Sequence, residues 1–304
     1  MAGLLARVLA IVGPTASGKS ALALRVAAEH GGEIVSCDSL QVYRGLDIGS
    51  AKPTAPERRA VRHHLLDVVS PDEEFSAADY ARLARAAIDD VLGRGRLPIV
   101  AGGTGLYLRG LRRGLFAGPA RDALLRARLE AIARGRGDAS LHRMLARVDP
   151  EAARRIEPRD RVRVVRALEV YHASGRTLTA HHLADAPSGD DRRWLVVGLD
   201  PPRESLRAAV EERTRATVEA GLVAEVRALL ERFPGDPRPL RAIGYRQAAE
   251  VVRGALTVEQ AQRDIVKETM QYAKRQRTWF RHQEDVRWFA DAASALRAIA
   301  EWLP

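Results

Sequence analysis

Apolar runs alternate with segments of helical spacing along the first third of the chain. The apolar run at 8–12 predicts a buried strand, and residues 21–30 place apolar side chains on one helical face before Gly31 and Gly32. The run GEIVSC is followed by Asp38, and the run LPIVAG leads into the glycine turn GGTGLYL. Strands and helices in this order predict a parallel α/β sheet.

The pattern also predicts helices on either side of the middle of the chain. Ser76 can cap a helix over 76–93, with Asp79 three residues further on. Later in the chain the apolar run WLVVGLD resumes the sheet. One long amphipathic helix is predicted to follow it over 203–233, and a second over 257–282.

The residues between the two predicted parts of the sheet differ in composition from the rest of the chain. Residues 117–193 are rich in Arg, Ala and Leu at helical spacing, which predicts an all-helical insertion. The polar, turn-rich segment DAPSGDD at 185–191 suits the linker back to the core. We therefore expect an α/β core formed by 1–116 and 194–304, interrupted by a helical domain of 117–193.

Charge and cysteine content narrow the classes of partner and compartment. The net charge of +10 favours a polyanion such as nucleic acid, although a GC-rich coding sequence could explain part of the Arg excess. The single cysteine, Cys37, excludes an internal disulfide and a cysteine-rich zinc module, and it fits the cytoplasm. No uninterrupted apolar segment reaches the roughly 20 residues that cross a bilayer, so we expect no membrane association.

The segment GPTASGKS, 13–20, has the pattern of a phosphate-binding loop. Gly13, Gly18, Lys19 and Ser20 fit GxxxxGK[ST] directly after a predicted strand. Glycines let backbone N–H groups converge on anionic oxygens, Lys19 adds a positive charge, and Ser20 can reach Mg²⁺. The pattern predicts a bound polyphosphate, and it leaves open what the phosphates are attached to. The predicted loop consists of Gly13, Pro14, Thr15, Ala16, Ser17, Gly18, Lys19 and Ser20.

Two polar residues follow predicted strands at the edge where open α/β sheets bind ligands. Asp38 is either a turn or capping aspartate, or a general base that faces the phosphate loop. Thr104 is either an N-cap threonine or a hydroxyl donor to a leaving group. Both roles are compatible at each position. His63 and His64 look like a metal pair, but adjacent side chains point in different directions, which favours a structural role.

Two basic segments have a structural and a functional interpretation. In RDRVRVVRALE, Arg159, Arg163 and Arg166 fall on one helical face, which is either solvated or in contact with phosphates. In KRQRTWFRHQ, 274–283, cations are mixed with aromatic residues as in nucleic-acid surfaces, although the aromatic residues could equally belong to a core.

Taken together, these stretches resemble the tRNA dimethylallyltransferases of the IPP transferase family. The motifs occur in the family's order and cover nearly the whole chain: GPTASGKS, CDSLQVYRGLDIGSAKP, HHLLDVVSP, AGGTGLYL, RALEVYHASG, AIGY and AKRQRTWF. The resemblance implies a P-loop NTPase or kinase-like core with an inserted helical domain. It also implies that the loop holds the diphosphate of dimethylallyl diphosphate instead of ATP.

The resemblance implies a role for each candidate residue in prenyl transfer to the adenosine on the 3′ side of the anticodon. Lys19, Mg²⁺, the loop N–H groups and Thr104 would stabilise the leaving diphosphate, and Arg213 would complete the clamp. Asp38 would remove a proton from the adenine amine. Ser20 would be the protein ligand of Mg²⁺, and Ser replaces a frequent Thr there. The implied tRNA contacts are Asp38, Ser39, Leu40, Gln41, Thr104, Arg126, Val162, Arg163, Val164, Val165 and Arg166.

Two departures from the family and two rival functions bear on this interpretation. Val162 stands where many relatives carry Gln, and the zinc finger of some eukaryotic relatives is missing.

A P-loop small-molecule kinase would use the same loop, and a non-catalytic RNA-binding protein could retain it as a vestige. The expected partners are the anticodon stem-loop of tRNA and dimethylallyl diphosphate, bound by a cytoplasmic monomer.

Overall fold

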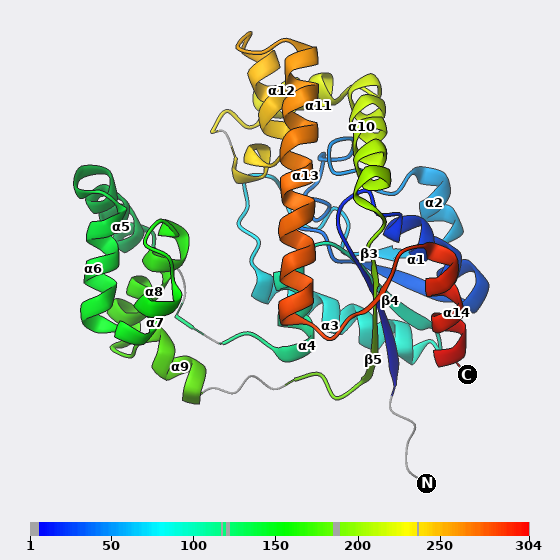
Figure 1. The fold of residues 1–304 in the computed structure, drawn as a ribbon, viewed down its shortest axis with the longest axis horizontal. Coiled ribbons are helices and arrows are strands. Elements are labelled where there is room, and N and C mark those ends of the chain that lie inside the picture. The colour runs from blue at the N-terminus through cyan, green and yellow to red at the C-terminus, as the bar shows by residue number, and fades with distance from the viewer. Residues whose placement is uncertain (1–5, 117, 120–121, 185–188, 236, 304) are drawn as a thin grey trace. The chain divides into compact units, whose positions relative to one another are not determined.

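The chain packs as two compact units that are described separately. The computed structural model describes residues 6–116, 118–119, 122–184, 189–235 and 237–303 (Figure 1). The core unit comprises 1–112 and 190–304, and the helical unit comprises 113–189. The division at 117 and 193 stays a prediction about domains, and residues 185–188 of the expected linker lie outside the described residues.

The core unit is built on one parallel sheet, which confirms the α/β fold class. Its strands lie in the order β3-β2-β4-β1-β5-β6, and every pairing is parallel. The strands are β1 (Arg7–Val12), β2 (Gly32–Ser36), β3 (His63–His64), β4 (Leu97–Gly102), β5 (Arg193–Leu199) and β6 (Arg287–Phe289). Because β4 and β5 flank β1, the carboxyl ends of distant segments meet beside the turn that follows β1.

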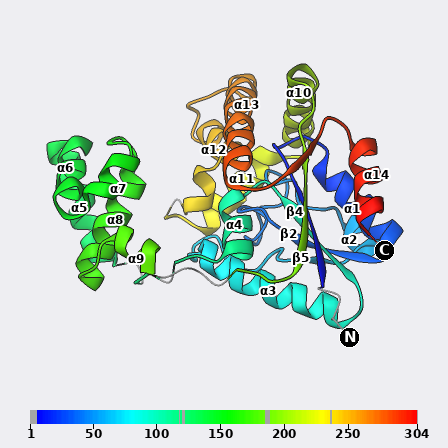
Figure 2. The same ribbon diagram turned by 60° about the horizontal axis from the view of Figure 1, so that its bottom comes forward.

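Helices cover both faces of this sheet (Figure 2). The helices of the core unit are α1 (Lys19–His30), α2 (Ala55–Ala60), α3 (Ala77–Gly93), α4 (Gly105–Arg113), α10 (Arg203–Glu219), α11 (Leu222–Arg232), the 3₁₀ helix η1 (Arg238–Arg241), α12 (Tyr245–Val252), α13 (Val258–Gln283) and α14 (Ala292–Trp302). Along β1, Val8 and Ala10 join a core shared with α3, α4 and α13, whereas Leu9 and Ile11 join one shared with α1 and α14. Alternate side chains of a strand point to opposite faces, so a strand buried on both faces is apolar throughout.

A third apolar cluster supports the loop that follows β2. Val42 and Leu46 of this loop are fully buried against α11, α12 and α13, where they meet Tyr245 and Val226. The loop after Asp38 is therefore anchored by packing along its length.

Capping confirms two of the predicted helices and corrects a third. Ser76 and Asp79 form a reciprocal capping box at the start of α3, and Thr257 caps α13. The single long helix predicted over 203–233 is wrong, because the chain forms α10 and α11 with Gly221 between them. Gly221 has a φ of +103°, a left-handed conformation that interrupts the helix and that side chains with a Cβ rarely adopt.

The helical unit has a small core of its own. Its helices are α5 (Ala123–Arg136), α6 (Asp138–Val148), α7 (Pro150–Arg155), α8 (Arg161–Ser174) and α9 (Leu178–Ala184). Leu129, Leu141, Leu145 and Leu168 pack together in that core. In the part of the chain that the structure describes, no helix is both long and apolar enough to cross a membrane.

Candidate active site

The phosphate loop connects β1 to α1 in a conformation that requires its glycines. Gly13 has a φ of +145°, and a Cβ on it would lie 2.5 Å from the carbonyl oxygen of Leu199 in β5. Gly18 has a φ of +88° and is the N-cap residue of α1. The N–H groups at the start of α1 are therefore exposed to the loop's concave side, where a helix N-terminus favours an anion. The hydroxyl oxygen of Ser17 is buried and has no hydrogen-bond partner among the described residues, which leaves a donor for a ligand.

Two partly buried cations face this loop. Lys19 donates from Nζ to the carbonyl oxygen of Pro14 at 3.1 Å, and Arg213 of α10 donates from Nη1 to the hydroxyl of Thr15 at 3.2 Å. Burial, and then the charge of Arg213, lower the pKa of Lys19 to about 8, although Asp38 opposes the shift. Burial also lowers the pKa of Arg213. Cations whose pKa falls in this way lack enough negative charge around them, and a bound polyanion would supply it.

A cavity of about 730 Å³ opens beside the loop. Its wall includes Thr15, Ala16 and Gly18–Ser20 of the loop, Asp38–Gln41, Arg213, the segment Arg241–Gly244 and the α13 residues Tyr272, Arg275 and Gln276. Ser20 thus lies on the same cavity as Asp38, as expected for a hydroxyl that shares Mg²⁺ with a bound diphosphate. Among the described residues, no group of three His, Cys, Asp or Glu side chains is placed to hold a metal ion.

Asp38 forms a turn and also lines the cavity. Its Oδ1 accepts hydrogen bonds from the N–H groups of Leu40 at 2.8 Å and Gln41 at 3.4 Å. The interpretation as a turn aspartate is therefore confirmed, and the position on the cavity wall is what a general base would need.

Thr104 lies directly behind this turn. Its N–H donates to the carbonyl oxygen of Cys37 at 3.2 Å, and its hydroxyl accepts from the N–H of Ser39 at 3.1 Å. The carbonyl of Thr104, and not its hydroxyl, accepts from the first N–H groups of α4, those of Tyr107 and Leu108. Thr104 is not among the described residues that line the cavity, so its contact with the site runs through Ser39.

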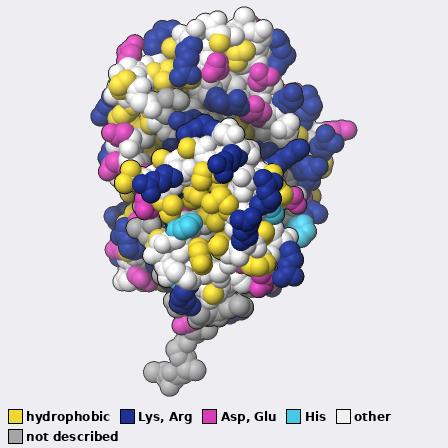
Figure 3. Space-filling view, turned by 90° about the vertical axis from the view of Figure 1, so that its left-hand side faces the viewer, with side chains coloured by type: hydrophobic (Ala, Val, Ile, Leu, Met, Phe, Trp, Pro, Cys, Tyr) yellow, Lys and Arg dark blue, Asp and Glu magenta, His cyan; other side chains and the backbone are white. Residues whose placement is uncertain are grey.

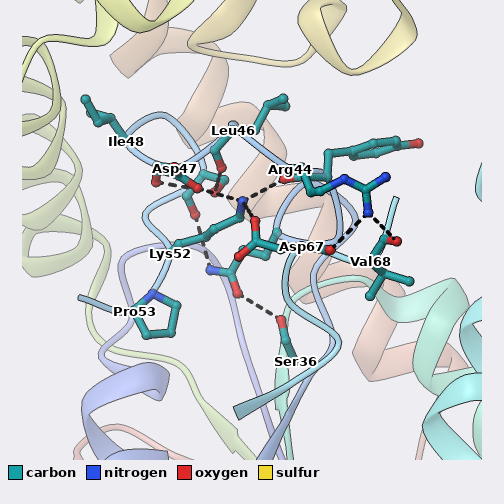
Figure 4. A network of polar contacts seen from close by, with 12 residues as sticks. Ser36, Arg44, Leu46, Asp47, Ile48, Lys52, Pro53, Asp67 and Val68 are labelled. Carbon is teal, nitrogen blue, oxygen red and sulfur yellow. Dashed lines mark hydrogen bonds and ion pairs between the residues drawn. The ribbon is translucent and has the colours of Figure 1, made fainter. Parts of the chain in front are cut away.

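A polar network holds the rest of the loop after β2 (Figure 4). The side-chain amide of Gln41 accepts from the Ser36 hydroxyl at 2.8 Å and donates to the carbonyl oxygens of Ser50 and Ala51. Lys52 donates to the carbonyl oxygen of Tyr43 and to two aspartates of the core unit. The amide of Gln41 is committed within the loop, so its side chain acts on the loop's shape.

The histidine pair has a structural role in the described chain. His64 of β3 contacts Oε2 of Glu33 at 2.7 Å through Nε2, and His63 contacts the carbonyl oxygen of Val61 at 2.8 Å through Nδ1. Glu33 is almost fully buried and also pairs with Arg94. The two histidines therefore hold the edge of the sheet.

The predicted tRNA contacts on the helical unit divide into exposed and buried positions. Val162 is 69% exposed and the side chain of Arg163 is 70% exposed. Val164 and Val165 are buried in the core of this unit, so their side chains are not exposed to tRNA, and a tRNA contact at these two positions stays a prediction. Arg159 does not share a helical face with Arg163 and Arg166, because Asp160 caps α8 and the helix begins only at Arg161.

Arg126 and Arg166 bind a buried carboxylate. Both donate to Oε2 of Glu169, at 2.9 and 3.1 Å, and the Glu169 side chain is completely buried. These two arginines therefore hold the helical unit together, which the spacing of basic residues did not indicate. On the face turned to the viewer in Figure 3, Lys and Arg side chains surround a group of hydrophobic side chains.

Helix α13 contributes two features that the sequence interpretation missed. A groove of about 1360 Å³ lies between α10 and α13, and Lys274, Arg277 and Arg281 of the predicted basic segment line it. Gln276, on the opposite side, is 7% exposed and hydrogen-bonds to the phosphate loop. The helical spacing of Ala273, Gln276 and Phe280 is the signal that could have identified a buried face here.

Comparisons with known proteins agree with the motifs. A family model described as IPP transferase matches residues 41–283. The tRNA dimethylallyltransferase of Anaeromyxobacter sp. (strain Fw109-5) is 52% identical over 93% of this chain and 94% of its own. The tRNA isopentenylpyrophosphate transferase of Bacillus halodurans has a similar structure, with a TM-score of 0.71, 37% identity and coverage of 97% and 95% of the two chains. A eukaryotic dimethylallyltransferase, whose crystallographic snapshots show it acting on tRNA, has a TM-score of 0.78 and 25% identity over 97% of this chain and 78% of its own.

Proposed function

The chain belongs to the IPP transferase family and is a tRNA prenyltransferase, and we propose that its donor is dimethylallyl diphosphate. The acceptor is the N6 amine of adenosine 37, on the 3′ side of the anticodon, and diphosphate is released. The observation that carries this proposal is the pair of partly buried cations, Lys19 and Arg213, which face one cavity together with Asp38. Neither the kinase nor the non-catalytic alternative is favoured by the family match.

The cations and the loop supply what the electrophile needs. An exocyclic adenine amine is a weak nucleophile because its lone pair is delocalised into the ring, so the allylic carbon must be strongly activated. Lys19, Arg213 and the N–H groups at the start of α1 stabilise the negative charge that develops on the departing diphosphate. Mg²⁺, when bound with the diphosphate, neutralises further charge, and the Ser20 hydroxyl is the protein group that fits it.

Asp38 acts as the base at the acceptor amine, and Thr104 holds the turn that carries Asp38. Asp38 takes the proton from N6 as the carbon–nitrogen bond forms. The Thr104 hydroxyl accepts from the N–H of Ser39, and a hydroxyl that accepts still has its own proton to donate. We assign Thr104 to holding the Asp38 turn through Ser39.

The tRNA contacts follow from the need to reach a single base. Adenosine 37 must leave the stack of the anticodon loop, and unstacked bases expose edges that a duplex hides. Asp38–Gln41 form the wall of the cavity that meets the base. Arg163 and the basic residues of α13 contact the phosphate backbone. The tRNA substrate supports a cytoplasmic reaction, and the monomeric state stays a prediction that sedimentation would test.

The decisive experiment is a transfer assay with defined components. Purified protein, Mg²⁺, unmodified tRNA and labelled dimethylallyl diphosphate are expected to give labelled tRNA without ATP. A tRNA with guanosine at position 37 is the matched control, and it should stay unlabelled. Strict dependence on ATP, or equal labelling of the control tRNA, would overturn the proposal.

A further inference from the structure

Gln276 joins two backbone segments of the site from helix α13. Its Oε1 accepts from the N–H of Thr15 in the phosphate loop at 2.9 Å, and its Nε2 donates to the carbonyl oxygen of Gly103 at 2.9 Å. Thr15 follows β1, and Gly103 follows β4 immediately before Thr104. One side chain thus joins the phosphate loop to the turn that follows β4.

We propose that Gln276 is a positioning residue that fixes the spacing between the phosphate loop and the turn carrying Thr104. This inference rests on the proposed function, because the spacing matters where a diphosphate leaves and a proton is handled nearby. Displacements of about 1 Å at a reacting centre can cost on the order of 10²-fold in rate. Gln276 lies on the cavity wall, and its amide oxygen and nitrogen bond to Thr15 and Gly103, so we assign its effect to these two contacts.

The glycine turn is shaped to receive this helix. A Cβ on Gly103 would lie 2.2 Å from Nε2 of Gln276, and a Cβ on Gly105 would lie 2.2 Å from the ring of Trp279. Two glycines therefore make room for two side chains that are about one turn apart on α13. Phe280 is fully buried beside them in the core shared with the sheet, so α13 is held against the turn by packing as well.

An amide meets both demands at this position without a change of protonation. Thr15 presents a donor and Gly103 an acceptor, and a glutamine offers an acceptor and a donor on adjacent atoms. An ionised glutamate accepts but cannot donate, and methionine provides neither bond. Gln276 occupies the N–H of Thr15, and the carbonyl oxygen of Pro14 accepts from the N–H of Ser17, so neither N–H is free for the diphosphate.

The test compares Gln276→Met and Gln276→Glu with the parent in the transfer assay, at saturating substrates and below every melting temperature. We expect kcat of Gln276→Met to fall about 10²-fold with little change in KM for tRNA. Gln276→Glu should recover relative to the parent as pH falls, because only the protonated carboxyl donates to Gly103; burial raises its pKa and the Asp38 carboxylate adds to this, whereas the charges of Lys19, Arg213 and Arg275 on the same cavity lower it. A structural role alone would move stability but not this pH-dependent ratio.

Gln260→Ala is the matched control on the same helix. It removes the capping partner of Thr257 at the far end of α13, so it should lower the melting temperature and leave kcat unchanged. Binding of inorganic pyrophosphate, which needs no transfer, separates this inference from the proposed function; we expect it to weaken about tenfold in Gln276→Met. Parent-like pyrophosphate affinity in Gln276→Met, or a Gln276→Glu ratio independent of pH, would overturn the positioning role even if the parent transferred no prenyl group.

Discussion

Replacing Lys52 by methionine should loosen the loop that carries Asp38. The Lys52 side chain is 2% exposed, and its ammonium donates to the Tyr43 carbonyl oxygen at 2.6 Å, to Asp47 Oδ1 at 2.7 Å and to Asp67 Oδ1 at 2.6 Å (Figure 4). Methionine keeps most of the apolar stem and provides no donor. The substitution therefore removes three charge-assisted hydrogen bonds while nearly preserving volume.

The loss of stability depends on which other donors can bind the three oxygens that Lys52 contacts. Breaking a fully buried ion pair by removing one partner costs about 3–5 kcal/mol. Here Asp47 is 58% exposed and water can replace the ammonium, and Asp67 is 33% exposed and keeps Arg58 at 3.0 Å. The Tyr43 carbonyl loses its charged donor, at a cost of about 1–3 kcal/mol. We expect the free energy of unfolding to fall by about 2 kcal/mol in total.

The pH dependence of the stability difference provides a second test of this prediction. Burial alone would raise the pKa of Asp67, but the hydrogen bonds and charges of Lys52 and Arg58 outweigh it and hold that pKa below 3.8. A depressed carboxyl pKa stabilises the fold above the unfolded value, and this contribution is lost as pH falls through the folded value. The difference in stability between parent and Lys52→Met should therefore be full near neutral pH and shrink below about pH 4.

Urea unfolding of the parent and Lys52→Met measures this difference. Lys267→Met, at an exposed position on α13, is the matched control and should change stability by less than about 0.5 kcal/mol. A Lys52→Met variant as stable as that control at neutral pH would refute the assignment of the network as the support of the loop.

Three further predictions concern the reaction and its substrates. Asp38→Ala should lower single-turnover transfer by roughly two to four orders of magnitude while tRNA binding changes little; near-normal turnover would leave Asp38 as a turn residue alone. Arg163→Ala should flatten the salt dependence of tRNA affinity by about one unit, and an unchanged slope would assign that residue to a solvated face. Arg166→Ala should mainly lower the melting temperature, because it removes one of the two arginines that pair with the buried Glu169. The affinity of the parent for pyrophosphate, divided by that of Lys19→Met, should fall as pH rises through about 8, because the Lys19 ammonium loses its proton there. If this ratio stays constant from pH 7 to about 9.5, the lowered pKa of Lys19 is contradicted.

The sequence predicted those parts of the fold that depend on neighbouring residues. The strand, phosphate loop and first helix were identified because glycine conformations and helix caps act over a few residues. The same holds for Ser76 with Asp79, which form the predicted capping box. The two-residue strand β3 and the three-residue strand β6 were missed, since strands this short are defined by their partners in the sheet.

Residues whose role depends on distant contacts could not be predicted in the same way. Gln276 and Thr15 are 261 positions apart, and no local pattern connects them. The basic spacing in α8 indicated a charged face, but the buried Glu169 pairs with Arg166 of that face and with Arg126 of α5. Charge patterns show where cations occur along the chain, and only packing shows which of them are already paired.

Under the proposed function, the charges of the site favour a strong hold on the diphosphate during transfer and a weaker one afterwards. Lys19 and Arg213 are both partly buried, and Asp38 is the carboxylate that raises the pKa of each. If Asp38 accepts a proton during transfer, its negative charge disappears just as the diphosphate gains charge by leaving the allyl group. The two cations are then neutralised by the diphosphate alone, which strengthens their hold on the leaving group in the step where charge develops. Return of the Asp38 proton to solvent restores the competing carboxylate, and that weakens the grip on the product diphosphate.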